Sequence, residues 1–86
     1  MNFKLSPHVE EEMQRRAIPR ALLESVLQNP QQVVPQKGER KAYQSQLDFG
    51  GGQIFLLRAI VDDTVDPPSV ITAYRTSKIS KYWRTT

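Results

Sequence analysis

The sequence has no cysteine and a single histidine, His8, among its 86 residues. Without cysteine the chain can form neither disulfide bonds nor thiolate nucleophiles, and the usual zinc ligand sets cannot be assembled. Small secreted domains with thin cores usually depend on disulfides, so their absence favours a reducing, cytoplasmic location. The spacing of the remaining polar residues indicates no metal site, and we expect no cofactor.

Long apolar runs are also missing. The longest, residues 54–61, is interrupted by Arg58 and is far shorter than the ~20 residues that a membrane-spanning helix needs. Residues 1–7 contain no apolar segment of the kind found in signal peptides. We therefore expect a soluble protein with no membrane partner.

The length sets a further limit. Domains usually hold about 100–150 residues, so the sequence predicts one domain over residues 1–86. A core of this size does not also enclose a large ligand cavity. We expect any active site to be a shallow groove on the surface.

Acidic side chains are absent from the last part of the chain. The net charge is +3, and residues 1–36 balance four basic side chains against four acidic ones. No acidic residue follows Asp66, whereas basic residues recur at every third position in Arg75, Lys78, Lys81 and Arg84. This local charge favours an anionic partner such as a phosphate backbone. A solubilising tail is the alternative.

Two helices are predicted near the N-terminus. Ser6 is a typical N-cap, and Pro7 occupies the first helical position, where its missing N–H is not needed. Pro19 disfavours helical geometry in the residue before it, so this helix should end near residues 16–17. The second helix begins at Pro19 and ends at residues 29–30, with an apolar stripe for the core formed by Leu22, Leu23, Val26 and Leu27.

Beyond the second helix the apolar period changes to two, which is typical of strands. Strands are predicted over residues 40–49, 53–61 and 70–75, and short strands or extended segments over residues 3–5 and 33–34. Strands joined by short loops pair antiparallel. The predicted fold is therefore α+β, with two N-terminal helices packed on one face of a three- to four-stranded antiparallel sheet and a short basic C-terminal tail.

Strand alternation indicates where chemistry could lie. The odd positions of residues 53–61 are all apolar and should face the helices, so Arg58 marks the opposite, open face. On the next strand Ile71 and Ala73 suit the core, which places three further side chains beside Arg58: Val70, Thr72 and Tyr74. With Arg40 on the same face and the basic tail at its edge, the sequence predicts a phosphate-binding surface with an aromatic partner for stacking.

Each of these residues also has a purely structural interpretation. Arg58 could pair with Asp48 across the hairpin, and Tyr74 could be an ordinary strand aromatic. Residues 82–83, a tyrosine and a tryptophan, could simply anchor the tail, and His8 could be a capping or packing side chain.

Several segments resemble the DUF4258 family. They read Leu-Ser-Pro-His at 5–8, Met-Gln-Arg-Arg-Ala-Ile at 13–18, Val-Leu-Gln-Asn-Pro at 26–30 and Val-Ile-Thr-Ala-Tyr-Arg-Thr-Ser-Lys-Ile-Ser-Lys-Tyr-Trp at 70–83. Proteins of this family are similar to the RelE/BrnT-type toxins of bacterial toxin–antitoxin pairs, which are small basic ribonucleases with N-terminal helices on an antiparallel sheet.

The resemblance implies a RelE-like fold and a metal-independent RNA endonuclease of the mRNA interferase type. Its partners would be RNA, on the ribosome or free, and a cognate antitoxin. The implied catalytic residues are His8, Arg58 and Tyr74, and the implied RNA-binding residues are Arg40, Arg75, Lys78, Lys81, Tyr82 and Arg84. The alternative is a non-catalytic module of the same fold that binds nucleic acid or protein.

Overall fold

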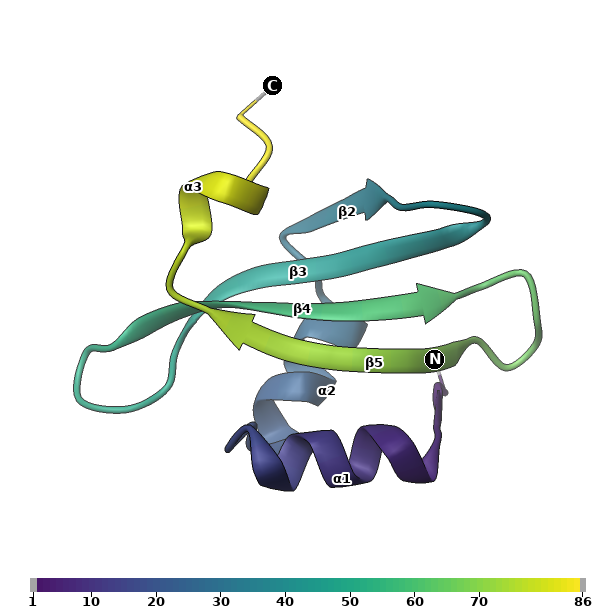
Figure 1. The fold of residues 1–86 in the computed structure, drawn as a ribbon, viewed down its shortest axis with the longest axis horizontal. Helices are drawn as coiled ribbons and strands as arrows, with labels where there is room; N and C mark the ends of the chain where they lie inside the picture. The colour runs from purple at the N-terminus through teal and green to yellow at the C-terminus, as the bar shows by residue number, and fades with distance from the viewer. Residues whose placement is uncertain (1, 86) are drawn as a thin grey trace.

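The computed structural model describes residues 2–85 and contains three helices and one five-stranded sheet (Figure 1). The helices are α1 (Pro7–Arg15), α2 (Arg20–Gln28) and α3 (Ile79–Tyr82). The strands are β1 (Lys4–Leu5), β2 (Gln32–Pro35), β3 (Arg40–Asp48), β4 (Ile54–Asp62) and β5 (Ser69–Thr76). Within residues 2–85, no helix is both long enough and apolar enough to cross a membrane.

The sheet is mixed, with the strand order β1-β5-β4-β3-β2. Strand β1 runs parallel to β5, and all the other neighbours are antiparallel. The predicted α+β class is confirmed, but the predicted three to four strands, all antiparallel, are wrong. The two edge strands, only two and four residues long, lie where the sequence indicated short strands or extended segments, and the pairing of both with the sheet makes five strands.

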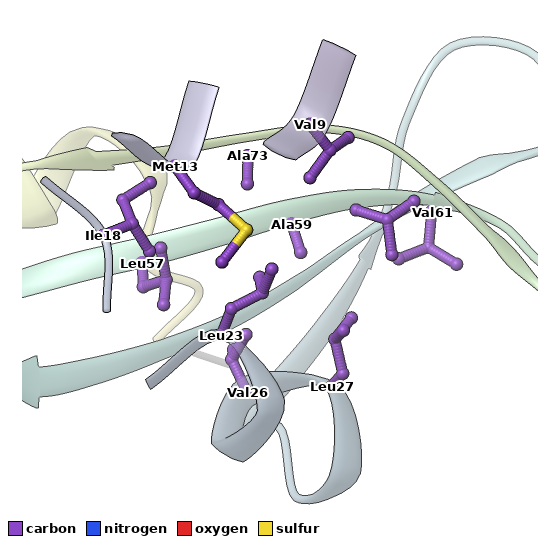
Figure 2. Packing of buried hydrophobic residues seen from close by; sticks show 11 residues of the cluster. Val9, Met13, Ile18, Leu23, Val26, Leu27, Leu57, Ala59, Val61 and Ala73 are labelled. Atoms are coloured by element: carbon purple, nitrogen blue, oxygen red, sulfur yellow. The ribbon is translucent and has the colours of Figure 1, made fainter. Parts of the chain in front are cut away.

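The hydrophobic core lies between the sheet and the helices α1 and α2 (Figure 2). Helix α1 supplies Val9 and Met13, and β4 supplies Leu57, Ala59 and Val61. These β4 residues are the predicted odd positions, so the assignment of the two faces of β4 is confirmed. The core cluster is completed by Ile18, Leu23, Val26, Leu27, Val70 and Ala73.

A β-bulge places Val70 and Ile71 of β5 on other faces of the sheet than the sequence predicts. Ile60 pairs with Thr72, but the next β4 residue, Val61, pairs with Val70, so the register shifts between them. Val70 therefore lies fully buried in the core, and Ile71 is only partly buried. The expectation that Ile71 faces the core and Val70 the open face is wrong, because simple alternation does not include the extra residue of a bulge.

Helix α1 begins and ends with defined caps. The Val9 N–H donates to the Ser6 side chain over 3.2 Å, which confirms the predicted N-cap. At the other end the N–H of Ile18 donates to the Met13 carbonyl and the N–H of Ala17 to the Gln14 carbonyl. This pattern is a Schellman motif, in which the residue with positive φ is usually glycine. Here that residue is Ala17, with φ of 51°.

Replacing Ala17 with glycine is expected to stabilise the fold. An L-residue in the left-handed region costs about 1–2 kcal/mol, which glycine avoids. The matched control is Ala21→Gly in α2, where the same change should destabilise by about 0.5–1 kcal/mol. Urea unfolding of both variants measures the two free energies. An Ala17→Gly variant that is less stable than wild type would contradict this interpretation of the helix end.

Candidate nucleic-acid interface

Three neighbouring strands bring Gln44, Arg58 and Tyr74 together on the side of the sheet away from α1 and α2. Gln44 is the β3 partner of Arg58, and Tyr74 is its β5 partner. Because their β4 neighbours Leu57 and Ala59 point into the core, the three side chains project to the opposite side. We call the surface formed by Gln44, Arg58, Tyr74 and the adjacent Gln32 of β2 the Arg58 face.

The Arg58 guanidinium is buried and held from several directions. Only 4% of Arg58 is exposed. Its Nε donates to the Gln44 side-chain oxygen over 2.8 Å, and its Nη1 donates to the Tyr74 hydroxyl over 2.5 Å. The Tyr82 ring of α3 lies over the guanidinium, with its centroid 4.3 Å from Cζ. The group therefore has hydrogen-bond partners and a cation–π contact.

None of these partners carries a negative charge. Of the ion pairs in residues 2–85, none includes Arg58. Asp48 lies at the far end of β3 opposite Ile54 and accepts the Gly50 N–H over 2.7 Å. The alternative interpretation, in which Arg58 pairs with Asp48, is therefore not what the structure shows.

The C-terminal tail is fastened over the Arg58 face. The Gln44 amide donates to the Gln32 side-chain oxygen over 2.8 Å and to the Tyr82 carbonyl over 3.2 Å. The Gln32 side chain in turn accepts the Arg84 N–H over 3.1 Å and donates to the Arg84 carbonyl. Helix α3 consequently lies on the opposite side of the sheet from α1 (Figure 1). The tail covers the buried cation with backbone and aromatic groups.

The tail that covers Arg58 also carries exposed cations. Lys78, Lys81 and Arg84 are all exposed, and the Lys81 Nζ lies 5.3 Å from the Tyr82 ring centroid. Lys78 immediately precedes α3, with its N–H bound to the Thr76 hydroxyl. Of the predicted RNA-binding residues, Tyr82 therefore contacts Arg58, and Lys78, Lys81 and Arg84 lie on the segment that carries Tyr82.

Arg40 shares the sheet face but lies farther away. It is four residues from Gln44 along β3, which corresponds to about 14 Å of extended strand. There it opposes Asp62. Hydrogen bonds from Thr64, together with a smaller effect of the Arg40 charge, hold the pKa of Asp62 below its usual value. Arg40 therefore belongs to the far end of the face, beside an ionised carboxylate.

Two predicted site residues lie outside the Arg58 face. Arg75 is the β5 partner of core residue Leu57, so it projects toward the helix side. Its guanidinium lies over the rings of Phe49 and Phe55, 4.9 and 4.7 Å from their centroids. His8 lies on α1, also on the helix side of the sheet, with its side chain 60% exposed. The predicted catalytic set of His8, Arg58 and Tyr74 is therefore split between two faces.

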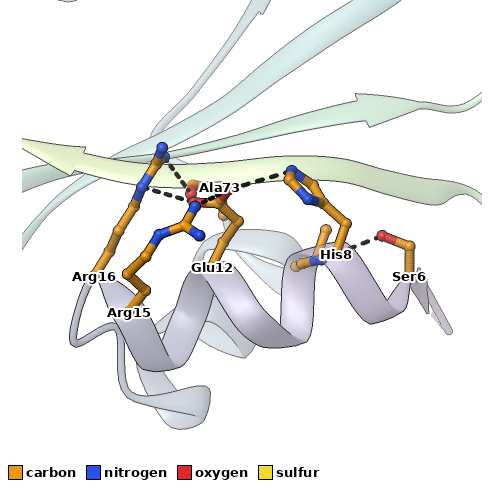
Figure 3. Close-up of polar contacts among 7 residues, drawn as sticks. Ser6, His8, Glu12, Arg15, Arg16 and Ala73 are labelled. Atoms are coloured by element: carbon orange, nitrogen blue, oxygen red, sulfur yellow. Dashed lines mark hydrogen bonds and ion pairs between the residues drawn. The ribbon is translucent and has the colours of Figure 1, made fainter.

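Two groups of residues were not predicted from the sequence. Gln32 and Gln44 stood out only as polar residues, and the sequence did not show that Gln44 bonds to Arg58 or that Gln32 bonds to Gln44. The second group surrounds Glu12, which contacts His8, Arg15 and Arg16 (Figure 3). His8 and Arg16 are each four positions from Glu12 in α1, and Arg15 is three positions from it. Side chains at these spacings lie next to each other on a helix, so the spacing was the signal that could have revealed the cluster.

The fold and this surface define a small α+β domain with a basic, aromatic sheet face. Among residues 2–85, no three histidine, cysteine, aspartate or glutamate side chains are grouped so that they could hold a metal ion. Residues 5–75 match the family described as Domain of unknown function (DUF4258), and the chain belongs to this family. The match ends within β5, before α3. None of the curated proteins and none of the solved structures matches the chain.

Proposed function

We propose that this protein binds RNA through the Arg58 face and cleaves it without a metal ion, as a RelE/BrnT-like toxin of a toxin–antitoxin pair. The observation that carries the proposal is the buried Arg58 guanidinium, which has hydrogen-bond partners but forms no ion pair within residues 2–85. A buried charge without an opposite charge is strongly unfavourable. An anionic ligand would supply the missing charge.

The surroundings of Arg58 favour a phosphodiester backbone as that ligand. Exposed Lys78, Lys81 and Arg84 provide a field of one sign that attracts a polyanion. Tyr74 and Tyr82 lie edge to face beside the guanidinium, with ring centroids 6.2 Å apart. Aromatic side chains next to cations are typical of surfaces on which unpaired bases stack.

The chemistry needs few protein groups, because RNA supplies its own nucleophile. The ribose 2′-hydroxyl gives its proton to water and its oxygen attacks phosphorus, the P–O5′ bond breaks, and the leaving 5′-oxygen takes up a proton. The products are a 2′,3′-cyclic phosphate and a 5′-hydroxyl. Arg58 would stabilise the charge that develops on the phosphoryl oxygens. Tyr74 accepts a hydrogen bond from Arg58, which leaves its own O–H free to donate to the leaving oxygen.

The tail must move for this reaction to occur. Arg58 is covered by Tyr82 and by the hydrogen bonds that hold residues 82–84. In the proposed complex Tyr82 leaves the guanidinium and stacks on a base, while Lys78 and Lys81 contact the backbone. A cognate antitoxin would block the same surface in the cytoplasm, and the ribosome would present the mRNA.

A second candidate function is RNA binding without cleavage. The observation that favours it is the position of His8, which lies on the helix side of the sheet and cannot act as an acid or base at Arg58. On this alternative the Arg58 face binds RNA, and the tail regulates access only.

Replacing Tyr74 with phenylalanine separates the two functions. If Tyr74 donates the proton, Tyr74→Phe should lower the rate of RNA cleavage in EDTA by about 10²-fold or more and leave RNA affinity almost unchanged. The matched control is Tyr43→Phe, because Tyr43 packs edge to face on Phe3 near the core. The assay measures 2′,3′-cyclic phosphate ends on a mixed RNA, with and without translating ribosomes.

Equal cleavage by Tyr74→Phe and wild type would remove Tyr74 from the mechanism. Binding of RNA by the wild-type protein without any cleavage, on the ribosome or off it, would favour the second candidate.

A further inference from the structure

Helix α1 carries a cluster of basic side chains that the proposed reaction does not use. The Glu12 carboxylate lies 2.5 Å from Arg15 Nη2, 2.7 Å from Arg16 Nε and 3.3 Å from His8 Nε2 (Figure 3). Glu12 is only 3% exposed, whereas the side chains of Arg15 and Arg16 are 63% and 40% exposed. One buried carboxylate thus orients two guanidinium groups that remain open to solvent.

This arrangement leaves positive charge and hydrogen-bond donors unused. Two guanidinium groups face one carboxylate, so the cluster has a net positive charge even when His8 is neutral. Arg15 donates to Glu12 through Nη2, whereas Arg16 Nε lies within ion-pair distance of Glu12 Oε2 without forming a hydrogen bond to it, and Arg16 Nη1 donates to the Ala73 carbonyl. The other N–H groups of both side chains have the fork geometry that suits phosphate oxygens. Because Glu12 already fixes the two side chains, binding an anion would order them at little further entropic cost.

The cluster adjoins the Arg58 face across the edge of β5. Arg16 Nη1 donates to the Ala73 carbonyl over 3.2 Å, and Tyr74 is the next residue of the same strand. Strand β1 pairs only with Ser69 and Val70. Among the strands of residues 2–85, none pairs with the outer edge of β5 from residue 71 onward, so the path of a ligand around this edge is not blocked by a neighbouring strand.

We propose that Arg15 and Arg16, oriented by Glu12, form a second phosphate-binding site for an RNA strand that leaves the Arg58 face over the edge of β5. This inference rests on the RNA binding proposed above and adds the path of the strand. The strand contacts Tyr74 and Arg58 on one side of β5, and its next phosphates contact Arg16 and Arg15 on the other. Arg15 and Arg16 also neutralise the buried Glu12 carboxylate, and the phosphate contacts would use the remaining N–H groups of the same two side chains.

The test measures the affinity of each variant for a mixed-sequence single-stranded RNA oligonucleotide at several salt concentrations. Arg15→Gln and Arg16→Gln should each weaken binding about three- to tenfold. Each should also lower the slope of log K against log salt by about 0.7, because a protein that neutralises one phosphate fewer on a single strand releases fewer counterions. The matched control is Arg20→Gln, because Arg20 is an equally exposed arginine paired with Glu10 rather than placed at β5. Thermal unfolding measures whether each variant is folded, because Arg15→Gln and Arg16→Gln each remove a cation from the buried Glu12 carboxylate.

Three outcomes are distinguishable. The first outcome supports the inference: Arg15→Gln and Arg16→Gln bind RNA more weakly and have a smaller slope of log K against log salt, whereas Arg20→Gln does not differ from wild type. The second outcome is that the wild type binds RNA and Arg58→Met does not, but Arg15→Gln and Arg16→Gln bind as tightly as Arg20→Gln. That result overturns the second site and leaves RNA binding at the Arg58 face supported. Absence of RNA binding by the wild-type protein overturns the proposed function, and the second site with it.

Discussion

Replacing Arg58 with methionine is expected to lower RNA affinity more than tenfold while leaving the protein folded. Methionine has a similar length and no charge, so it fills the space under Tyr82 without the cost of burying a cation. Replacement of a buried charge by an apolar side chain of similar volume is often neutral, or stabilising by about 1–4 kcal/mol. The variant nevertheless lacks the cation that we expect to contact the phosphate, so its RNA affinity should fall.

The stability of the variant depends on Gln44. Its side-chain oxygen accepts from Arg58 Nε and would be left unpaired in a fully buried position, at a cost of about 1–3 kcal/mol. We therefore expect the unfolding free energy of Arg58→Met to lie within about 2 kcal/mol of the wild-type value.

RNA affinity by fluorescence anisotropy and urea unfolding of the same samples give the two quantities. A folded Arg58→Met variant that binds RNA as tightly as wild type would refute the assignment of Arg58. A variant that is several kcal/mol less stable would show instead that Arg58 holds the fold together.

The largest loss of stability is expected from Leu23→Ala. Leu23 is fully buried in α2 and belongs to the core cluster with Met13 and Leu57 (Figure 2). Truncating such a leucine removes buried methyl groups and leaves a cavity, which costs about 2–5 kcal/mol. A domain of this size has a total stability near the lower end of about 5–15 kcal/mol. The midpoint of thermal unfolding should therefore fall by about 10–20 °C.

The neighbouring Leu22 provides the control for Leu23→Ala. It is only partly buried and packs at the margin of the cluster, and Leu22→Ala makes the same chemical change in the same helix. Calorimetry should give Leu22→Ala less than half the destabilisation of Leu23→Ala. Equal effects would mean that the core is not centred where the structure places it.

The parts of the fold that follow from local physics could be predicted from the sequence. Ser6, Pro7 and Pro19 indicated where the helices begin, and the apolar odd positions of β4 indicated its core face. The three glycines at 50–52 all have positive φ in the structure, as expected of a hairpin tip. These features depend on a few adjacent residues.

Features that depend on distant partners could not be predicted. The sequence indicated a short strand or extended segment at residues 3–5, but not its parallel pairing with Ser69 and Val70, more than sixty residues away in the chain. The bulge beside Val61 shows no local signal in the sequence, yet it exchanges the positions of Val70 and Ile71.

Only part of the candidate site could be predicted from the sequence. Alternation placed Arg58, Thr72 and Tyr74 on one face, and the structure agrees. The prediction of an open face was wrong, because nothing in the sequence showed that the Gln32 and Gln44 side chains fasten the tail over it. Arg75 and His8 were assigned by residue type, and the structure places both on the helix side.

The most direct test of RNA binding at the Arg58 face is an NMR titration of the ¹⁵N-labelled protein with a single-stranded RNA oligonucleotide. The buried Arg58 Nε–H and the Gln44 side-chain amide, protected by the tail, report on this face alone. We predict that both signals shift as RNA is added, together with the backbone signals of residues 78–84, while those of α2 stay in place. Shifts confined to other surfaces, with Arg58 and Gln44 unchanged, would contradict RNA binding at this face.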